Sequence, residues 1–167
     1  GFPLGHSFSR GFFTEKFSNE GIEAQYRNCE IPSIDDFHAI VENNPQLRGL
    51  NVTIPYKHQV MQFLDELSDE ARNIGAVNVV KVTHDENGSP RLKGLNSDVI
   101  GFVRSIKPLL KEHHKKALIL GTGGASKAIH YGLTEKLGME TLFVSRSQRE
   151  GCITYQDVTA DLLHEYE

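Results

Sequence analysis

The polar residues that could perform chemistry in the first half of the sequence stand at the ends of predicted elements. They offer hydroxyls, carboxamides, one amine and one carboxylate: Ser7, Ser9, Asn51, Thr53, Lys57, Asn78 and Asp98. This mixture suits a small polyhydroxylated ligand that is recognised by hydrogen bonds rather than by apolar packing. Each residue also has a plainer explanation. Ser9 and Asp98 are typical helix caps, Asn51 and Asn78 can satisfy backbone groups at strand ends, and Lys57 can be a surface lysine.

A glycine-rich loop follows an apolar strand pattern in the second half, in the stretch ALILGTGGASKA. Gly121 permits a tight turn, and Gly123 lets the backbone approach a pyrophosphate. The following helix would present free amides and its dipole to that anion. The loop can be merely structural, but the strand before it and the helix after it favour a dinucleotide cofactor. The cofactor-binding residues predicted here are Gly121, Thr122, Gly123, Gly124, Ala125 and Ser126.

The next strand of this half ends at Ser145-Arg146-Ser147. A site for NAD usually places Asp or Glu near this point to hold the ribose. A carboxylate would repel a 2′-phosphate, whereas Arg146 would attract it and could stack on the adenine. The pattern therefore favours NADP (NADPH) over NAD. A solvated loop arginine is the alternative explanation.

Helix and strand patterns alternate along the chain, which is typical of an α/β fold. The first helix is predicted between Ser9 as its N-cap and Gly21 as its C-terminal stop. Further helices are predicted over residues 32–42, 56–64, 68–74, 98–111 and 125–137, and strands over residues 25–31, 47–54, 76–82, 91–95, 117–120 and 141–144. Asn87-Gly88 supplies positive-φ positions for a turn between two of the strands. Residues 117–144 form one βαβ unit, the crossover that builds parallel sheets.

Composition excludes several classes of function. Hydrophobic residues make up 38% and charged residues 24% of the 167, and the net charge is -4, so neither nucleic acid nor an anionic membrane is an expected partner. No apolar run approaches the roughly 18–20 residues of a membrane span. Cys29 and Cys152 lack CxxC spacing and predict free thiols in the cytoplasm. His113-His114 lacks a ligand framework, so no metal site is expected.

Five motifs in this order and spacing closely resemble the shikimate dehydrogenase family: GFPLGHSFS, NVTIPYK, GAVN, NSD and GTGGASKA. The resemblance implies an NADP-linked oxidoreductase that reversibly reduces 3-dehydroshikimate to shikimate in chorismate and aromatic amino-acid biosynthesis. It also implies a monomer or homodimer. Its implied plan is an N-terminal α/β shikimate-binding domain at residues 1–97, a connecting helix and linker at 98–114, and the first part of a Rossmann-like NADP-binding domain at 115–167.

The resemblance assigns roles to the polar residues. Ser7 and Ser9 would bind the shikimate carboxylate, while the ring hydroxyls would be held by Asn51, Thr53, Asn78 and Asp98. Lys57 and Asp98 would form the catalytic pair. The chemistry agrees, because reducing a ketone needs a proton at oxygen as well as a hydride at carbon. The Lys57 ammonium can donate that proton, and the Asp98 carboxylate would hold the amine in place.

The motifs depart from the family pattern at several positions. Arg10 replaces a common proline, and Val99 replaces the glycine of the usual N-T-D-G. Ser145, Arg146 and Ser147 replace the usual N-R-T, and the next basic residue, Arg149, comes one place early. The phosphate clamp formed by these four residues is therefore similar to the family's but not identical.

Two alternatives to this function are open. One is a quinate/shikimate dehydrogenase that also uses NAD, and the other is a non-catalytic ligand-binding relative. The family's strand before GFPLGHS and about half of the six-stranded dinucleotide fold are not found in the sequence. We therefore expect the chain alone to expose unpaired strand edges, to be poorly stable and to be inactive.

Overall fold

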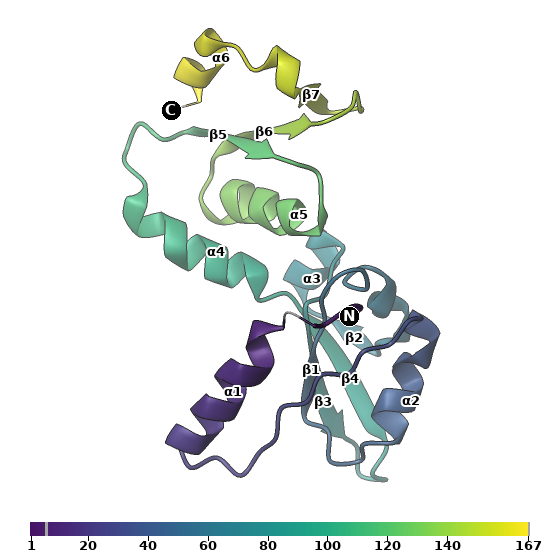
Figure 1. Cartoon of the computed structure of the whole chain (residues 1–167). Helices are drawn as coiled ribbons and strands as arrows, with labels where there is room; N and C mark the ends of the chain where they lie inside the picture. The colour runs from purple at the N-terminus through teal and green to yellow at the C-terminus, as the bar shows by residue number, and fades with distance from the viewer. Residues whose placement is uncertain (6, 167) are drawn as a thin grey trace.

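The computed structural model, which describes residues 1–5 and 7–166, has two lobes that are each built on their own sheet (Figure 1). His6, within the first motif, lies outside the described residues. The first sheet has the strand order β1-β3-β4-β2. Its strands are β1 (Gly49–Asn51), β2 (Glu66–Leu67), β3 (Val79–His84) and β4 (Pro90–Leu95). The β1–β3 and β3–β4 pairs are antiparallel and the β2–β4 pair is parallel.

The β3–β4 hairpin confirms the turn that the sequence predicts. Asp85 Oδ1 accepts bonds from the backbone N–H groups of Asn87 and Ser89, both at 2.9 Å. Gly88 has φ of 80° and is the turn residue in the left-handed region. The prediction was wrong for Asn87, which keeps a negative φ. The Asp85 side chain supports the turn, which therefore needs a positive φ only at Gly88.

Short helices cover the first sheet: η1 (Ile34–Asp36), α2 (Phe37–Glu42), η2 (Gln59–Phe63) and α3 (Asp69–Ile74). α3 is capped at both ends, since Ser68 Oγ accepts from Ala71 N at 3.1 Å and Gly75 has φ of 70°. The core between these helices and the sheet is aliphatic and aromatic, and it contains Phe37, Val41, Val52, Tyr56, Val60, Ala71, Val77, Val80, Val82 and Leu92.

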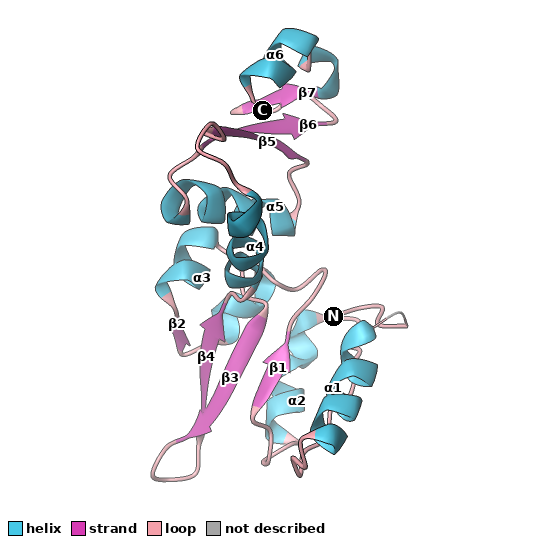
Figure 2. Ribbon diagram, turned by 90° about the vertical axis from the view of Figure 1, so that its left-hand side faces the viewer, coloured by secondary structure: helices cyan, strands magenta, loops and turns pink. Residues whose placement is uncertain are grey.

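Helix α1 (Phe8–Asn19) stands beside the first sheet rather than on it (Figures 1 and 2). None of its residues is buried. The predicted cap was wrong: the helix begins at Phe8, with Ser7 in the N-cap position and no side-chain cap bond. Ser9 lies inside the first turn. Gly21, at φ of 63°, follows the helix end as predicted.

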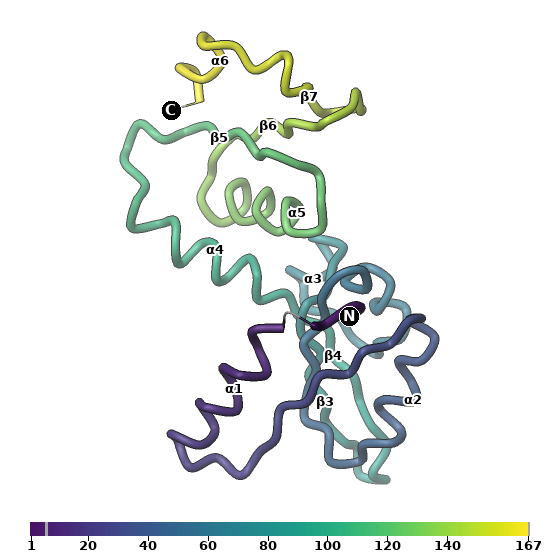
Figure 3. The backbone as a smooth tube through the Cα atoms, in the orientation of Figure 1, coloured from purple at the N-terminus to yellow at the C-terminus, as the bar shows by residue number. Residues whose placement is uncertain are grey.

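Residues 25–31 were predicted to form a strand, and that prediction was wrong. The segment runs extended between α1 and α2 but joins no sheet (Figure 3). A strand exists only where a second backbone edge lies within hydrogen-bond reach. Here residues 24–29 and residues 49–53 line one cavity, and β1 pairs with β3 rather than with this segment.

The second lobe is a parallel sheet in the order β5-β6-β7, made of β5 (Lys116–Leu120), β6 (Glu140–Ser145) and β7 (Cys152–Thr154). Helix α5 (Gly124–Tyr131) and the π-helical turn Gly132–Lys136 join β5 to β6, which confirms the predicted βαβ unit. Two further elements follow, η5 (Tyr155–Asp157) and α6 (Ala160–Glu165), on the far side of the sheet from α5 (Figure 1).

Helix α4 (Asp98–Ile106) connects the lobes and continues as η3 (Lys107–Leu109). The predicted end at 111 is too late, because Pro108 cannot continue an α-helix. Val99 of α4 lies in one buried cluster with Ile74 and Ala76 of the first lobe and with Ala128 of α5. This junction therefore brings the start of α4 close to α5, the helix that follows the glycine-rich loop.

Candidate active site

The amine and the carboxylate that the sequence pairs across 41 residues meet in the structure. Lys57 Nζ lies 2.7 Å from Asp98 Oδ2. The side chains are 21% and 37% exposed, so the pair is reachable from solvent but partly shielded by protein. Asp98 is also the first residue of α4, and a negative side chain there interacts favourably with the helix dipole.

Asn78 holds the other oxygen of the carboxylate. Its Nδ2 donates to Asp98 Oδ1 at 2.7 Å and to Ser97 Oγ at 3.0 Å, while its Oδ1 accepts from Ser97 N at 2.8 Å. Both carboxylate oxygens of Asp98 thus have a donor. The Asn78 carboxamide, predicted to bind a substrate hydroxyl, also orients Asp98 in this structure.

Asn96 is a supporting residue that the sequence reasoning missed. It is only 4% exposed. Its Nδ2 donates to Ala76 O at 3.0 Å, and its Oδ1 accepts from Asp98 N at 3.1 Å and from Val99 N at 3.4 Å. An asparagine just before a helix is a familiar capping signal. Here it ties the first turn of α4 to the loop before β3.

Backbone bonds bring the motifs together around this pair. Val77 N donates to Lys57 O at 2.7 Å, and Val52 N donates to Asn78 O at 2.8 Å. The NVTIPYK segment is therefore bonded at two points to the GAVN segment. Lys57 is placed by this backbone frame, which fixes the base of a long and otherwise mobile side chain.

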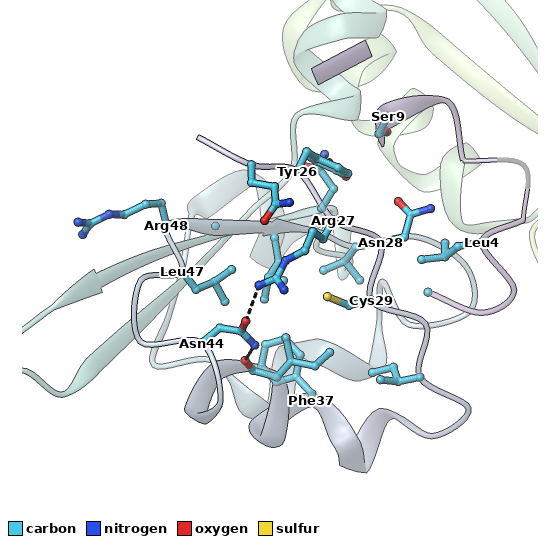
Figure 4. A pocket seen from close by; sticks show the side chains of 18 of the residues that line it. Leu4, Ser9, Tyr26, Arg27, Asn28, Cys29, Phe37, Asn44, Leu47 and Arg48 are labelled. Atoms are coloured by element: carbon cyan, nitrogen blue, oxygen red, sulfur yellow. Dashed lines mark hydrogen bonds between the residues drawn. The ribbon is translucent and has the colours of Figure 1, made fainter. Parts of the chain in front are cut away.

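The other four predicted substrate residues line a cavity of about 820 Å³ in the first lobe: Ser7, Ser9, Asn51 and Thr53. Figure 4 shows this cavity with Tyr26 and Ser9 toward one side and Phe37 and Asn44 toward the other. Its lining also includes the apolar residues Ile31, Phe37 and Leu47. Only the polar part of the lining therefore matches a polyhydroxylated acid.

Lys57, Asn78 and Asp98 do not line this cavity. The structure thus brings the seven predicted residues together in two groups, one at the Lys57–Asp98 pair and one in the lining of the cavity. Asn51 and Thr53 line the cavity. Val52, which stands between them in the sequence, donates its backbone N–H to Asn78 O. The two groups are consequently neighbours.

The glycine-rich loop has the shape that a pyrophosphate needs. Gly121 has φ of 116°, where a side chain would strain the backbone, and a Cβ at Gly123 or Gly124 would meet open space. Helix α5 begins at Gly124 without a side-chain cap. Ser126 N donates to Gly123 O at 3.1 Å, so the N–H groups that can meet an anion are those of Gly124 and Ala125. Thr122 and Ala125 flank these glycines, and the buried Ser126 closes the turn through Oγ to Gly123 O at 2.6 Å.

Basic side chains stand at the end of β6, beside this loop. Arg146 is exposed, and Arg149 Nη1 donates to Thr122 Oγ1 of the loop at 3.3 Å. Ser145 is buried, and its Oγ accepts from Ser147 N at 3.4 Å. The open glycine turn and these two guanidinium groups together fit a dinucleotide that carries an extra phosphate.

Two negative findings concern the described part of the chain. None of its helices combines the length and apolarity that crossing a membrane requires. Within residues 1–5 and 7–166, no group of three or more His, Cys, Asp or Glu side chains is arranged to hold a metal ion.

Comparison with known proteins matches residues 1–80 to the shikimate dehydrogenase substrate binding domain. The shikimate dehydrogenase (NADP(+)) of Caldicellulosiruptor saccharolyticus is 36% identical over 167 residues, which span 98% of this chain. Residues 1–80 belong to the shikimate dehydrogenase substrate binding domain family. The chain spans 58% of the length of the Caldicellulosiruptor relative.

Solved shikimate dehydrogenases are similar in fold to this chain over part of their length. The enzyme of Aquifex aeolicus is 37% identical, with a TM-score of 0.75 over 88% of this chain and 54% of that one. The enzyme of Thermus thermophilus, solved in complex with NADP(H) and shikimate, is 29% identical, with a TM-score of 0.76 over 99% of this chain and 58% of that one. The α/β fold class that the sequence predicts is confirmed.

Proposed function

We propose that this chain carries the shikimate-binding domain and the first part of the cofactor domain of an NADP-dependent shikimate dehydrogenase. The observation that carries the proposal is the 2.7 Å ion pair between Lys57 and Asp98. It stands at the junction of a lobe that matches a shikimate-binding family and a lobe that holds a dinucleotide-type loop. Binding alone would not require an acid–base pair at that place.

The proposed reaction is the reversible reduction of 3-dehydroshikimate to shikimate. The nicotinamide supplies a hydride to the carbonyl carbon when the cofactor is bound. Lys57 donates a proton from its ammonium to the carbonyl oxygen and takes it back in the direction of alcohol oxidation. Asp98 holds Lys57 in position by its Oδ2, while Asn78 on Oδ1 keeps the carboxylate from rotating.

The remaining residues are proposed to bind the substrate and the cofactor. Ser7 and Ser9 receive the carboxylate of shikimate, and its hydroxyls are received by Asn51, Thr53, Asn78 and Asp98. The glycine turn receives the pyrophosphate, and Arg146 and Arg149 the 2′-phosphate, which supports NADP. The domain limits 1–97, 98–114 and 115–167 remain our proposal, and α4 packs on elements of both lobes. Free Cys29 and Cys152 agree with a reducing compartment such as the cytoplasm.

Initial rates of the complete enzyme that contains this chain test the proposal. We expect oxidation of NADPH in the presence of 3-dehydroshikimate, with much slower oxidation of NADH. Comparable rates with 3-dehydroquinate or with NADH would replace the proposal by a quinate/shikimate dehydrogenase. Shikimate binding without any turnover would identify a non-catalytic relative.

A further inference from the structure

Tyr26 contacts the substrate-binding candidate Asn51 although 25 residues separate them. Asn51 Nδ2 donates to Tyr26 Oη at 3.1 Å. In a carboxamide the oxygen and the nitrogen point in different directions, so a bond at Nδ2 also fixes where Oδ1 points. The Tyr26 hydroxyl therefore sets the direction in which Asn51 offers its acceptor.

The ring of Tyr26 makes a second, independent contact. It stacks on Phe13 of α1, with the ring centroids 5.0 Å apart and the planes inclined by 8°. Phe13 in turn contacts Phe17 at a centroid distance of 5.8 Å. No residue of α1 is buried, and this aromatic stack attaches the helix to the segment that contains Tyr26.

Helix α1 begins directly after Ser7 and contains Ser9 in its first turn. Tyr26 thus touches the helix that carries the two serines with its ring, and Asn51 with its hydroxyl. Tyr26, Ser7, Ser9 and Asn51 also line the same cavity, and Figure 4 shows Tyr26 and Ser9 at that side of it. One side chain consequently links the two groups that are proposed to hold opposite ends of the substrate.

We propose that Tyr26 is a positioning residue of the substrate site, which fixes the Asn51 carboxamide by its hydroxyl and the spacing of α1 by its ring. This inference rests on the proposed function, because it assumes that Asn51 and the serines bind shikimate. Groups that are oriented before binding lose less freedom when the ligand arrives. The contribution of Tyr26 therefore lies in substrate affinity and not in the proton transfer.

The test is Tyr26→Phe in the complete enzyme, a change that keeps the ring stack and removes the hydroxyl. A neutral hydrogen bond contributes about 0.5–1.5 kcal/mol, so the KM for shikimate should rise about 2- to 10-fold with kcat unchanged. In the background of Asn51→Ala the same change should have no further effect on KM. Tyr26→Leu, which also removes the stack, should raise KM beyond the phenylalanine variant.

Tyr155→Phe is the control for the loss of a tyrosine hydroxyl. Tyr155 lies in η5 of the second lobe, is 48% exposed and does not line the cavity, so the loss of its hydroxyl should leave the KM for shikimate unchanged. An unchanged KM in Tyr26→Phe, or additive effects of Tyr26→Phe and Asn51→Ala, would overturn the inference while the proposed function stands. Absence of 3-dehydroshikimate reduction by the unmodified enzyme would overturn both.

Discussion

Asn78 and Asp98 are joined by a 2.7 Å hydrogen bond that occupies the one carboxylate oxygen left free by Lys57. The Asp98 carboxylate is thereby fixed in rotation as well as in position. A group that must align an amine for proton transfer gains from such fixation, because small displacements at a reacting site slow the chemistry strongly.

Replacing Asp98 by Asn tests the role of its charge. The side chain keeps its size, but a carboxamide offers one acceptor oxygen where the carboxylate offered two. We expect Asp98→Asn to lower kcat by about 10²-fold or more. Asp161→Asn is the control, since Asp161 also lies in the first turn of a helix, α6, but away from the junction. Equal kinetics for the two variants would contradict the role of Asp98.

The two arginines beside the glycine turn should decide the choice of cofactor. Charge-assisted hydrogen bonds contribute about 1.5–3 kcal/mol, so Arg146→Ala and Arg149→Ala should each raise the KM for NADPH about 10- to 100-fold. The KM for NADH should change little, because NADH lacks the 2′-phosphate. Arg91→Ala, at an exposed arginine of β4, serves as the control. An equal rise of KM for NADPH and for NADH would show that the arginines do not contact the 2′-phosphate.

Gly132 determines how closely α4 approaches the helix after the glycine loop. A Cβ there would lie 3.1 Å from Val103 Cγ2, 3.2 Å from Phe102 Cδ1 and 3.3 Å from Val99 Cγ2. Gly132→Val should therefore lower the free energy of unfolding by about 1–3 kcal/mol. Gly101→Ala on the open side of α4, where nothing lies within 4 Å, should raise it by about 0.5–1 kcal/mol. Denaturant unfolding measures both, and a neutral Gly132→Val would contradict the packing.

Glu70 in α3 connects the lobes through Lys136, whose Nζ lies 3.3 Å from its carboxyl. A bond from its own backbone N–H, and then the bond from Lys136, lower the pKa of Glu70 below the ordinary 4.5. The Glu70 carboxyl therefore binds a proton more readily in the unfolded chain than in the folded chain. The contribution to stability is consequently present above about pH 4.5 and is lost as the pH falls through the lowered value.

An NMR titration of Glu70 checks this pH dependence. In Lys136→Met we expect the pKa of Glu70 to move back toward 4.5 and the acid-side loss of stability to shrink. Both side chains are substantially exposed, with 43% for Lys136 and 36% for Glu70, so the effect should weaken in high salt. A pKa of Glu70 that is the same with and without Lys136 would show that the ion pair does not lower this pKa.

Local signals explain why much of the fold could be predicted. The β3–β4 hairpin follows from its turn residues, α3 from its cap Ser68, and the βαβ unit from an apolar strand followed by glycines. Each of these rests on residues that are close in sequence. The same holds for the glycine turn, whose positive φ at Gly121 depends on its own backbone.

Contacts between distant residues explain what could not be predicted. Residues 25–31 have strand-like composition, but a strand also needs a partner edge, and this segment joins neither sheet. Asn96 and Tyr26 act through partners 20 and 25 residues away, for which no local pattern exists. Lys57 was an ordinary surface lysine by its own sequence context. The folded chain sets it against Asp98.

The account depends most directly on Lys57 as the proton donor. Steady-state reduction of 3-dehydroshikimate by Lys57→Ala, with shikimate affinity measured separately by calorimetry, tests that claim in the complete enzyme. We predict that kcat falls by about 10²–10⁴-fold while shikimate affinity changes far less. Unchanged turnover, or a loss of affinity as large as the loss of turnover, would contradict the assignment.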